Sequence, residues 1–220
     1  PAVMAAEADD NDASTIRVVG HVDPLGLLPD QDAPKSVSAV SSDFIIKQAP
    51  TLNAFQLVNM LPGANVSTTD PYGLSPYSSI TLRGLGQDAI GVVLEGAPQN
   101  DIGYFYAYPS QFADAENVRQ IALSQGTVDI DAPVVAAAGG LLSLTLDDPK
   151  NTLGALVNLS VGSYNQRRAF VRVDTGEIAK TGIKAFVSYS NNRADAWRGA
   201  GFDKRQHVDA KLLTEWGDGN

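Results

Sequence analysis

Four segments in the second half of the chain alternate apolar and polar residues. This period of two predicts β-strands, because successive side chains of a strand point to opposite faces. One face is apolar and comprises Ala155, Val157, Leu159, Val161, Ala169, Val171, Val173, Ile183, Ala185, Val187, Tyr189, Val208, Ala210, Leu212 and Thr214. The other face is mostly polar and includes Asn158, Ser160, Arg168, Arg172, Asp174, Lys184, Ser188, Ser190, His207, Asp209 and Lys211. We expect turns at residues 163–166 and 175–181, and a polar loop at residues 191–205.

Two architectures fit this alternation. Strands of roughly 9 to 12 residues with one apolar face are typical of transmembrane β-barrels, and Tyr164, Tyr189 and Trp216 lie where an interfacial aromatic girdle would be. A water-soluble antiparallel meander that buries one face shows the same alternation. No run reaches the roughly 18 to 20 apolar residues of a spanning helix, so any crossing of a membrane must use strands.

The stretch from Ser78 to Asp101 predicts two further strands. Its apolar runs, residues 80–82 and 89–94, end in the turn signals Arg83-Gly84 and Glu95-Gly96-Ala97-Pro98. Short β-branched runs that are bounded by Gly and Pro are typical of strands, and we expect these two to pair with each other.

The preceding residues predict a strand and two short helices. Residues 36–40 alternate as a strand does, and Ser41 or Ser42 can cap a helix that runs to about Gln48. A second helix is expected to start at Thr51 or Asn53 and to end at Pro62-Gly63. Its apolar face would hold Leu52, Phe55, Leu57, Val58 and Leu61. Residues 67–79 are expected to form a loop.

The order of these motifs resembles the plug domain of TonB-dependent outer-membrane receptors. Matching positions are Leu61-Pro62-Gly63, Arg83-Gly84, Glu95-Gly96-Ala97-Pro98, residues 116–126 and Gly139-Gly140, so the resemblance covers residues 36–148. The resemblance implies an α+β plug domain, followed by antiparallel strands of an incomplete transmembrane β-barrel. It divides the chain into an arm at residues 1–35, a plug at residues 36–150 and four barrel strands at residues 151–220.

The resemblance also places a TonB-binding peptide, the TonB box, in the arm. The candidate is the β-favouring segment Thr15, Ile16, Arg17, Val18, Val19 and Gly20. An extended peptide of this kind can add a strand to the exposed sheet edge of a partner.

Aromatic residues mark the candidate ligand-binding loops. Four of them lie within five residues of one Gly- and Pro-bounded loop, and two lie in the loop before it: Tyr104, Phe105, Tyr106 and Tyr108, with Tyr72 and Tyr77. Aromatic rings provide contact area at low entropic cost. In the family such loops touch the substrate; packing of the rings against the barrel wall is the alternative.

The family's plug charges, which pair with barrel carboxylates, are only partly kept. Arg83 and Glu95 are the candidate plug-locking residues. The chain departs from the family pattern at Ala122, where the family has Glu, and at Gln125, where it has Arg. These departures place the family's plug-release mechanism in doubt.

Composition excludes several classes of function. The formal charge of −9 disfavours nucleic acid as a partner. The chain has no Cys and two distant His residues, His21 and His207, so we expect no catalytic residue, metal site or cofactor.

The resemblance implies active import of a scarce, bulky solute across the outer membrane of a Gram-negative bacterium. The expected partners are TonB, a small-molecule or chelate substrate and outer-membrane lipid. An outer-membrane ligand-binding or adhesion module without energised transport is the alternative. A barrel that holds a plug has about 22 strands, which is far more than four, so we expect the chain to be the N-terminal part of a larger receptor.

Overall fold

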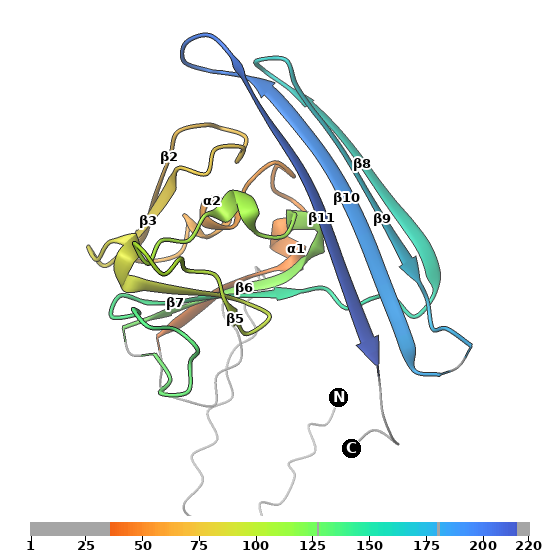
Figure 1. Cartoon of the computed structure of the whole chain (residues 1–220), viewed down its shortest axis with the longest axis horizontal. Helices are drawn as coiled ribbons and strands as arrows, with labels where there is room; N and C mark the ends of the chain where they lie inside the picture. Colours follow the sequence, from red (N-terminus) through yellow and green to blue (C-terminus); the bar gives the residue numbers. More distant parts are fainter. Residues whose placement is uncertain (1–35, 127, 180, 215–220) are drawn as a thin grey trace, which may run out of the picture.

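The computed structural model describes residues 36–126, 128–179 and 181–214, which form two parts (Figure 1). The described residues between 36 and 148 form a compact unit around a mixed sheet. Residues 153–214 contribute four long strands, which we call the wall. In Figure 1 the wall stands beside the compact unit and bends over it. One face of the wall therefore meets the compact unit, and the other faces outward.

The compact unit is built on a five-stranded sheet with the order β1-β6-β7-β4-β5, in which β4 and β7 are parallel and the other neighbours are antiparallel. A separate hairpin pairs β2 with β3. The strands are β1 (Val37–Ser41), β2 (Ala64–Thr68), β3 (Ser78–Leu82), β4 (Ile90–Leu94), β5 (Ala97–Pro98), β6 (Val118–Gln125) and β7 (Gly140–Leu146). Three 3₁₀ turns join them: η1 (Gln87–Ala89), η2 (Pro109–Gln111) and η3 (Ala115–Asn117).

Both expected helices are present and short. In α1 (Ser42–Ile45), Ser41 occupies the N-cap position, but its side chain makes no capping hydrogen bond. In α2 (Ala54–Val58), Asn53 and Gln56 form a reciprocal capping box. This arrangement satisfies two backbone N–H groups that the first helical turn would otherwise leave without partners.

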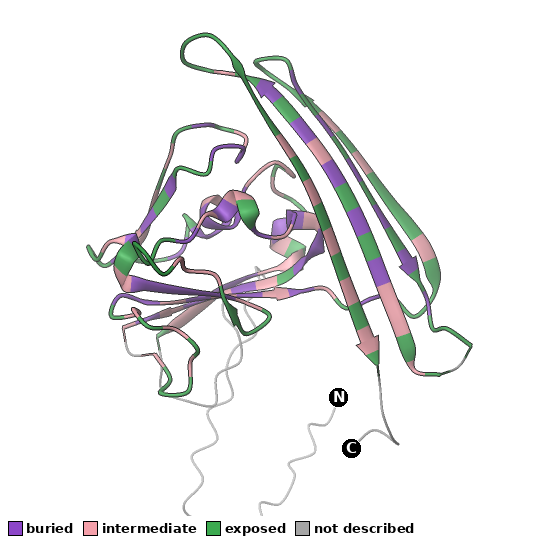
Figure 2. Ribbon diagram, viewed as in Figure 1, coloured by how far each residue is buried: buried purple, intermediate pink, exposed green. Residues whose placement is uncertain are grey.

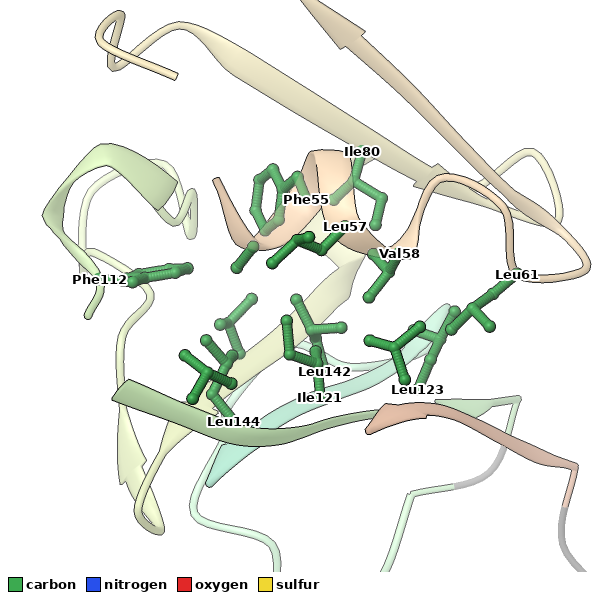
Figure 3. Close-up of a cluster of buried hydrophobic side chains, with 14 of the residues drawn as sticks. Phe55, Leu57, Val58, Leu61, Ile80, Phe112, Ile121, Leu123, Leu142 and Leu144 are labelled. Carbon is green, nitrogen blue, oxygen red and sulfur yellow. The ribbon is translucent and has the colours of Figure 1, made fainter. Parts of the chain in front are cut away.

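The core of the compact unit lies between α2 and the five-stranded sheet (Figure 3). Phe55 and Phe112 meet edge to face, with ring centroids 6.1 Å apart. Opposite α2, the sheet contributes Ile121 and Leu142, which are fully buried. Each buried side chain of this size contributes about 1.5–3 kcal/mol. The apolar face predicted for the second helix is therefore a core face.

The expected pairing of β3 with β4 is wrong. β3 pairs with β2, a strand the sequence analysis did not predict, and the loop expected at residues 67–79 shortens to residues 69–77. β4 lies between β5 and β7, because the Gly139 N–H donates to the Ala89 carbonyl at 2.7 Å and aligns Gly140 with Ile90. On the side where β3 was expected, β4 thus pairs with β7, which is distant in the sequence.

The wall is an antiparallel sheet with the order β11-β10-β9-β8. Its strands are β8 (Leu153–Gly162), β9 (Gln166–Thr175), β10 (Ile183–Asp195) and β11 (Phe202–Thr214). The polar loop expected at residues 191–205 is wrong in its bounds, because β10 and β11 stay paired as far as Asp195 and Phe202. Only residues 196–201 are left to connect them. On the inner face of this extension, Asn192 and Ala194 are buried.

The wall buries its polar face and exposes its apolar face. Figure 2 shows buried and exposed residues alternating along β10. On β9, the buried side chains include Arg168 and Arg172, whereas Val171 between them is 39% exposed. On β8, Leu159 is 75% exposed. A water-soluble meander would bury the apolar face instead. The structure therefore excludes that alternative and supports the barrel-strand interpretation.

Within the described residues, no helix combines the length and apolarity that a membrane-spanning helix needs. The aromatic residues Tyr164 and Tyr189 are 49% and 41% exposed, and Trp216 lies outside the described residues.

The glycines of the compact unit provide a stability prediction. Gly140 has φ +137°, and an added Cβ would lie 2.2 Å from the Ser124 carbonyl oxygen. Gly96 has φ +78°, but nothing lies within 4 Å of its added Cβ. We expect Gly96→Ala to cost about 1–2 kcal/mol through backbone strain alone. Gly140→Ala should cost at least about 2 kcal/mol more, because the β6–β7 pairing must shift.

Urea titrations of the two variants, followed by circular dichroism, measure this difference. Equal losses of unfolding free energy would show that the close approach of β6 and β7 at Gly140 does not limit stability.

Candidate functional site

The candidate site is the contact between the inner face of the wall and the compact unit. We call its charged and polar residues the clasp. They are Glu95, Asp114, Glu116, Asn117 and Asp148 from the compact unit, and Arg168, Arg172, Arg205, Asp209 and Lys211 from the wall. The alternation of β9 and β11 places the wall residues on one face, and the chain around η3 brings three of their partners to that face.

Arg168 is the most buried cation of the clasp, with its side chain 1% exposed. Its two terminal nitrogens donate to the two carboxylate oxygens of Glu116, at 2.5 and 2.8 Å. Asp114 lies 3.3 Å away on the same guanidinium. This forked geometry is the strongest that a guanidinium and a carboxylate can adopt. Because both charges have left water, loss of either partner would cost about 3–5 kcal/mol.

Arg205 extends the clasp on β11 by binding three acceptors of the compact unit. Its Nη1 donates to Asp114 Oδ1 at 2.6 Å, and its other nitrogens donate to the carbonyls of Ser110 and Phe112 at 2.7 and 2.8 Å. Asp114 therefore bridges two wall arginines. The six contacts of Arg168 and Arg205 to compact-unit groups hold the chain around η2 and η3 against the wall.

Asn117 is fully buried at the centre of the clasp. Its amide nitrogen donates to Ser188 Oγ and to Asp209 Oδ2, each at 2.7 Å. The same Asp209 oxygen accepts the backbone N–H of Asp114 at 3.1 Å. The amide oxygen of Asn117 accepts from Arg172 at 3.3 Å. One side chain thus contacts β9, β10 and β11, and its partners share a single network.

Arg172 is held mainly by wall groups. It pairs with Asp174 on its own strand at 2.8 Å, and its guanidinium carbon lies 3.8 Å from the centroid of the Phe186 ring. It also donates to the Asp148 carbonyl at 3.2 Å. The wall therefore compensates this charge largely by itself.

Lys211 closes the clasp at the end of β7. Its ammonium lies 3.2 Å from Glu95 Oε1 and 2.9 Å from Asp148 Oδ1, and it donates to the Leu146 carbonyl at 3.1 Å. The hydrogen bond from Lys211 lowers the pKa of Asp148 below its ordinary value. Asp148 therefore remains ionised at the acidities where a free Asp begins to take up a proton.

The two residues named as plug-locking lie in different places. Glu95 contacts Lys211 of the wall and also accepts the Leu146 N–H at 2.5 Å. Arg83 donates to Gln125 Oε1 at 2.9 Å and to Ser36 Oγ at 3.3 Å, so both of these bonds lie within the compact unit. Gln125 in turn donates to the Pro62 carbonyl. A locking role for Arg83 and Glu95 stays a prediction.

The contacts with the four wall strands include acidic plug residues that bind wall cations. The family resemblance implied plug cations that pair with barrel carboxylates, whereas here Asp114 and Glu116 are acidic residues that bind wall arginines. Neither Asp114 nor Glu116 is among the site residues predicted from the sequence. The sequence pattern that could have predicted them is the pair Arg168 and Arg172. Two arginines on one face of a predicted strand need acidic partners if that face is buried.

Of the six aromatic candidates for ligand contact, Tyr72 contacts the wall, and most of the others are exposed at the surface. Tyr72 donates from its hydroxyl to the Ser163 carbonyl at the β8–β9 turn, at 2.9 Å. By contrast, Tyr77 and Tyr104 are 75% and 73% exposed, and Phe105 and Tyr106 are also exposed. Tyr108 is half-buried, and burial together with a hydrogen bond to Asp101 raises its pKa. Ligand contact by these six residues stays a prediction.

The loop at residues 69–77 is held by internal hydrogen bonds and meets two hairpin tips of the wall. Asp70 organises it by accepting the backbone N–H groups of Tyr72, Leu74 and Ser75, at 2.8, 3.1 and 2.7 Å. Trp197, in the β10–β11 connection, donates to the Thr69 carbonyl. An open cleft of about 450 Å³ lies between this loop and residues 196–203.

Among the described residues, no group of three or more His, Asp or Glu side chains could hold a metal ion. The candidate TonB box, Thr15 to Gly20, lies outside the described residues.

The clasp predicts a large effect for Arg168→Met in the full-length protein. This change leaves the buried carboxylates of Glu116 and Asp114 without their shared cation, and should cost about 3–5 kcal/mol of the free energy that holds the compact unit to the wall. Amide hydrogen exchange across β6 measures that free energy. Adding Glu116→Gln should restore part of the loss, because it removes one of the uncompensated charges.

Arg167→Met is the matched control, because this neighbour on β9 has its side chain exposed on the outer face. It should change the same free energy by less than about 0.5 kcal/mol. Similar effects at positions 167 and 168 would contradict the assignment of the clasp.

Comparison with known proteins places this geometry in a family. The model of the TonB-dependent receptor plug domain matches residues 29–140. No curated protein matches the chain.

Solved structures share the fold at low identity. The Pseudomonas aeruginosa receptor FpvA, bound to heterologous pyoverdines, matches with a TM-score of 0.70 and 14% identity over 84% of this chain and 24% of its own. The alcaligin receptor FauA of Bordetella pertussis gives 0.67 and 19% over 87% of this chain and 31% of its own. The ferric yersiniabactin uptake receptor FyuA of Yersinia pestis gives 0.62 and 20% over 81% and 28%.

The chain therefore spans 24% to 31% of the length of these receptors. The expected fold class, an α+β plug followed by antiparallel strands of an incomplete barrel, is confirmed. The compact unit corresponds to the plug and the wall to barrel strands. Since the family model covers just over half of the chain, the protein belongs to the TonB-dependent receptor plug-domain family.

Proposed function

We propose that this chain is the N-terminal part of a TonB-dependent active transporter in the outer membrane of a Gram-negative bacterium, and that it imports a scarce, bulky solute. The solute binds above the plug, TonB engages the arm, and the energised pull on the arm rearranges the plug. No covalent bond changes in this process, so the proposal needs no catalytic residue.

The observation that supports this proposal best is the polarity of the wall. Its outer face presents Leu159, Val171 and other exposed apolar side chains, as lipid-facing barrel strands do. Its inner face is polar and is covered by the plug through the clasp. A plug held by ion pairs and hydrogen bonds can be released without unfolding an apolar interface, because water can replace these partners.

A siderophore is the class of solute that we propose. The similar structures include an alcaligin receptor and a ferric yersiniabactin uptake receptor, each at about one fifth identity to this chain. The exposed rings of Tyr77, Tyr104 and Tyr106 offer contact area for a bulky ligand. We propose that these rings, with Tyr72, Phe105 and Tyr108, contact the ligand at the outer side of the plug.

Removal of the candidate TonB box tests energised import. Deletion of residues 15–20 from the full-length receptor should abolish solute uptake by cells and leave surface binding of the solute intact, because the deletion removes the strand that TonB would pair with. Uptake and binding are measured separately with a radiolabelled ferric siderophore that wild-type cells take up.

Deletion of residues 4–9 shortens the arm equally and should leave uptake unchanged. Normal uptake without residues 15–20 would refute import through this segment, and would favour a binding module that transports nothing.

The lipid-facing assignment predicts a second effect. Val171→Arg on the outer face of β9 should destabilise the full-length receptor in a bilayer by about 2–4 kcal/mol if position 171 lies near the midplane. Glu177→Arg, in the β9–β10 turn, introduces the same side chain outside the strands and should cost less than about 1 kcal/mol. Urea unfolding in lipid vesicles gives both values, and equal costs would argue against lipid at this face.

A further inference from the structure

The charges of the chain are divided between plug and wall. Residues 36–148 contain eleven acidic and three basic residues, whereas residues 149–214 contain five acidic and eleven basic residues. The clasp is the place where these opposite charges meet. The plug is therefore the acidic partner of a basic wall.

Two carboxylates on the inner face of the wall each have a partner within the wall. Asp174 pairs with Arg172 on β9 at 2.8 Å, and Asp209 lies 2.8 Å from His207 on β11. If the plug moves away, these pairs can remain, because both members of each pair belong to the same strand.

Three wall cations have a different environment. In the described part of the chain, the acidic partners of Arg168, Arg205 and Lys211 all belong to the plug. The peptide carbonyls that Arg205 and Lys211 bind are plug groups as well. Displacement of the plug therefore leaves three positive charges along β9 and β11 without their acidic partners.

We infer that the solute that passes along this wall is anionic, and that its anionic oxygens replace the plug carboxylates on Arg168, Arg205 and Lys211. The inference rests on the proposed function, because it requires the plug to move. Basic side chains that line a pore favour the entry of anions, and an unpaired cation in a narrow lumen attracts them most strongly.

The geometry of the plug contacts shows what such a solute has to offer. Glu116 binds the Arg168 guanidinium through two oxygens, and Asp114 bridges two arginines through one. Carboxylate and phosphate groups can reproduce the forked contact, whereas a neutral or cationic group cannot. The inferred solute therefore carries anionic oxygens that can bind arginine in pairs.

Ser190 provides a position from which to test this inference. It lies on the inner face of β10, is fully buried, and its hydroxyl makes no hydrogen bond within the described residues. Its neighbour on that face, Asn192, is aligned with Arg168 on β9 and with Arg205 on β11. Since residues 1–220 contain no Cys, Ser190→Cys adds a single thiol to this region.

The experiment uses a full-length receptor with Ser190→Cys and no other cysteine, in intact cells. The thiol is allowed to react with two methanethiosulfonate reagents of similar size, one carrying a sulfonate and one a trimethylammonium group, and each rate is divided by the rate with free cysteine. In energised cells the corrected rate should be at least about fivefold higher for the sulfonate reagent, because the nearby arginines attract the anion. An uncoupler should suppress both reactions.

Arg205 and Lys204, which are adjacent on β11, provide a test variant and its control. Arg205→Gln removes an inner-face charge and should lower the sulfonate preference by about twofold or more. Lys204→Gln removes an exposed charge from the outer face and should leave the preference unchanged.

The outcomes test separately whether the plug moves and whether the solute is anionic. If neither reagent reacts in energised cells, the energised rearrangement of the plug is refuted and the anionic solute falls with it. If both reagents react with equal corrected rates, or the cationic reagent reacts faster, the proposed movement of the plug stands. The inference of an anionic solute is then overturned. An equal loss of preference in Arg205→Gln and Lys204→Gln would also overturn the inference.

Discussion

The clasp makes the two parts of this chain depend on each other. A strand face that contains Arg168 and Arg172 is stable only against water or against a surface that supplies acceptors, since an unpaired buried charge is costly. The plug supplies these acceptors through Asp114, Glu116 and Asn117. In return, the wall covers charged plug groups that the small apolar core beneath α2 cannot accommodate.

This dependence also explains why the wall has its apolar side outward. The strands alternate strictly, so burial of the polar face under the plug forces the apolar face away from it. A single polar contact surface therefore fixes the environment of both faces. The fold is that of barrel strands that turn a polar face to the plug and an apolar face away from it.

The polar interface suits the proposed function, in which the plug is first held against the wall and then released. Ion pairs and hydrogen bonds stabilise the closed arrangement when their geometry is good, and their groups are well solvated when they separate. The plug has a second set of contacts with the wall. Through hydrogen bonds of Tyr72 and Trp197, the loop at residues 69–77 contacts the two hairpin tips. A ligand in the cleft beside that loop would contact both parts at once.

In the clasp, plug carboxylates bind wall cations, which is the opposite sign from the pairing that the family resemblance implied. Arg83 remains, but it donates to Gln125 and braces the plug internally. Because Gln125 carries an amide instead of a guanidinium, it can accept that bond. The substitution at position 125 thus removes a charge and creates a contact within the plug.

The sequence by itself determined the strand segments of the wall, their two faces, the apolar face of α2 and the family. These features are local, because a period of two or a turn motif is written in neighbouring residues. Tertiary structure decided what the sequence could not: the partner of β3, the strand Ala64–Thr68, the length of the β10–β11 hairpin and the whole clasp. These features depend on contacts between residues as distant as Asp114 and Arg205, and no local pattern specifies which of many possible partners a buried charge will meet.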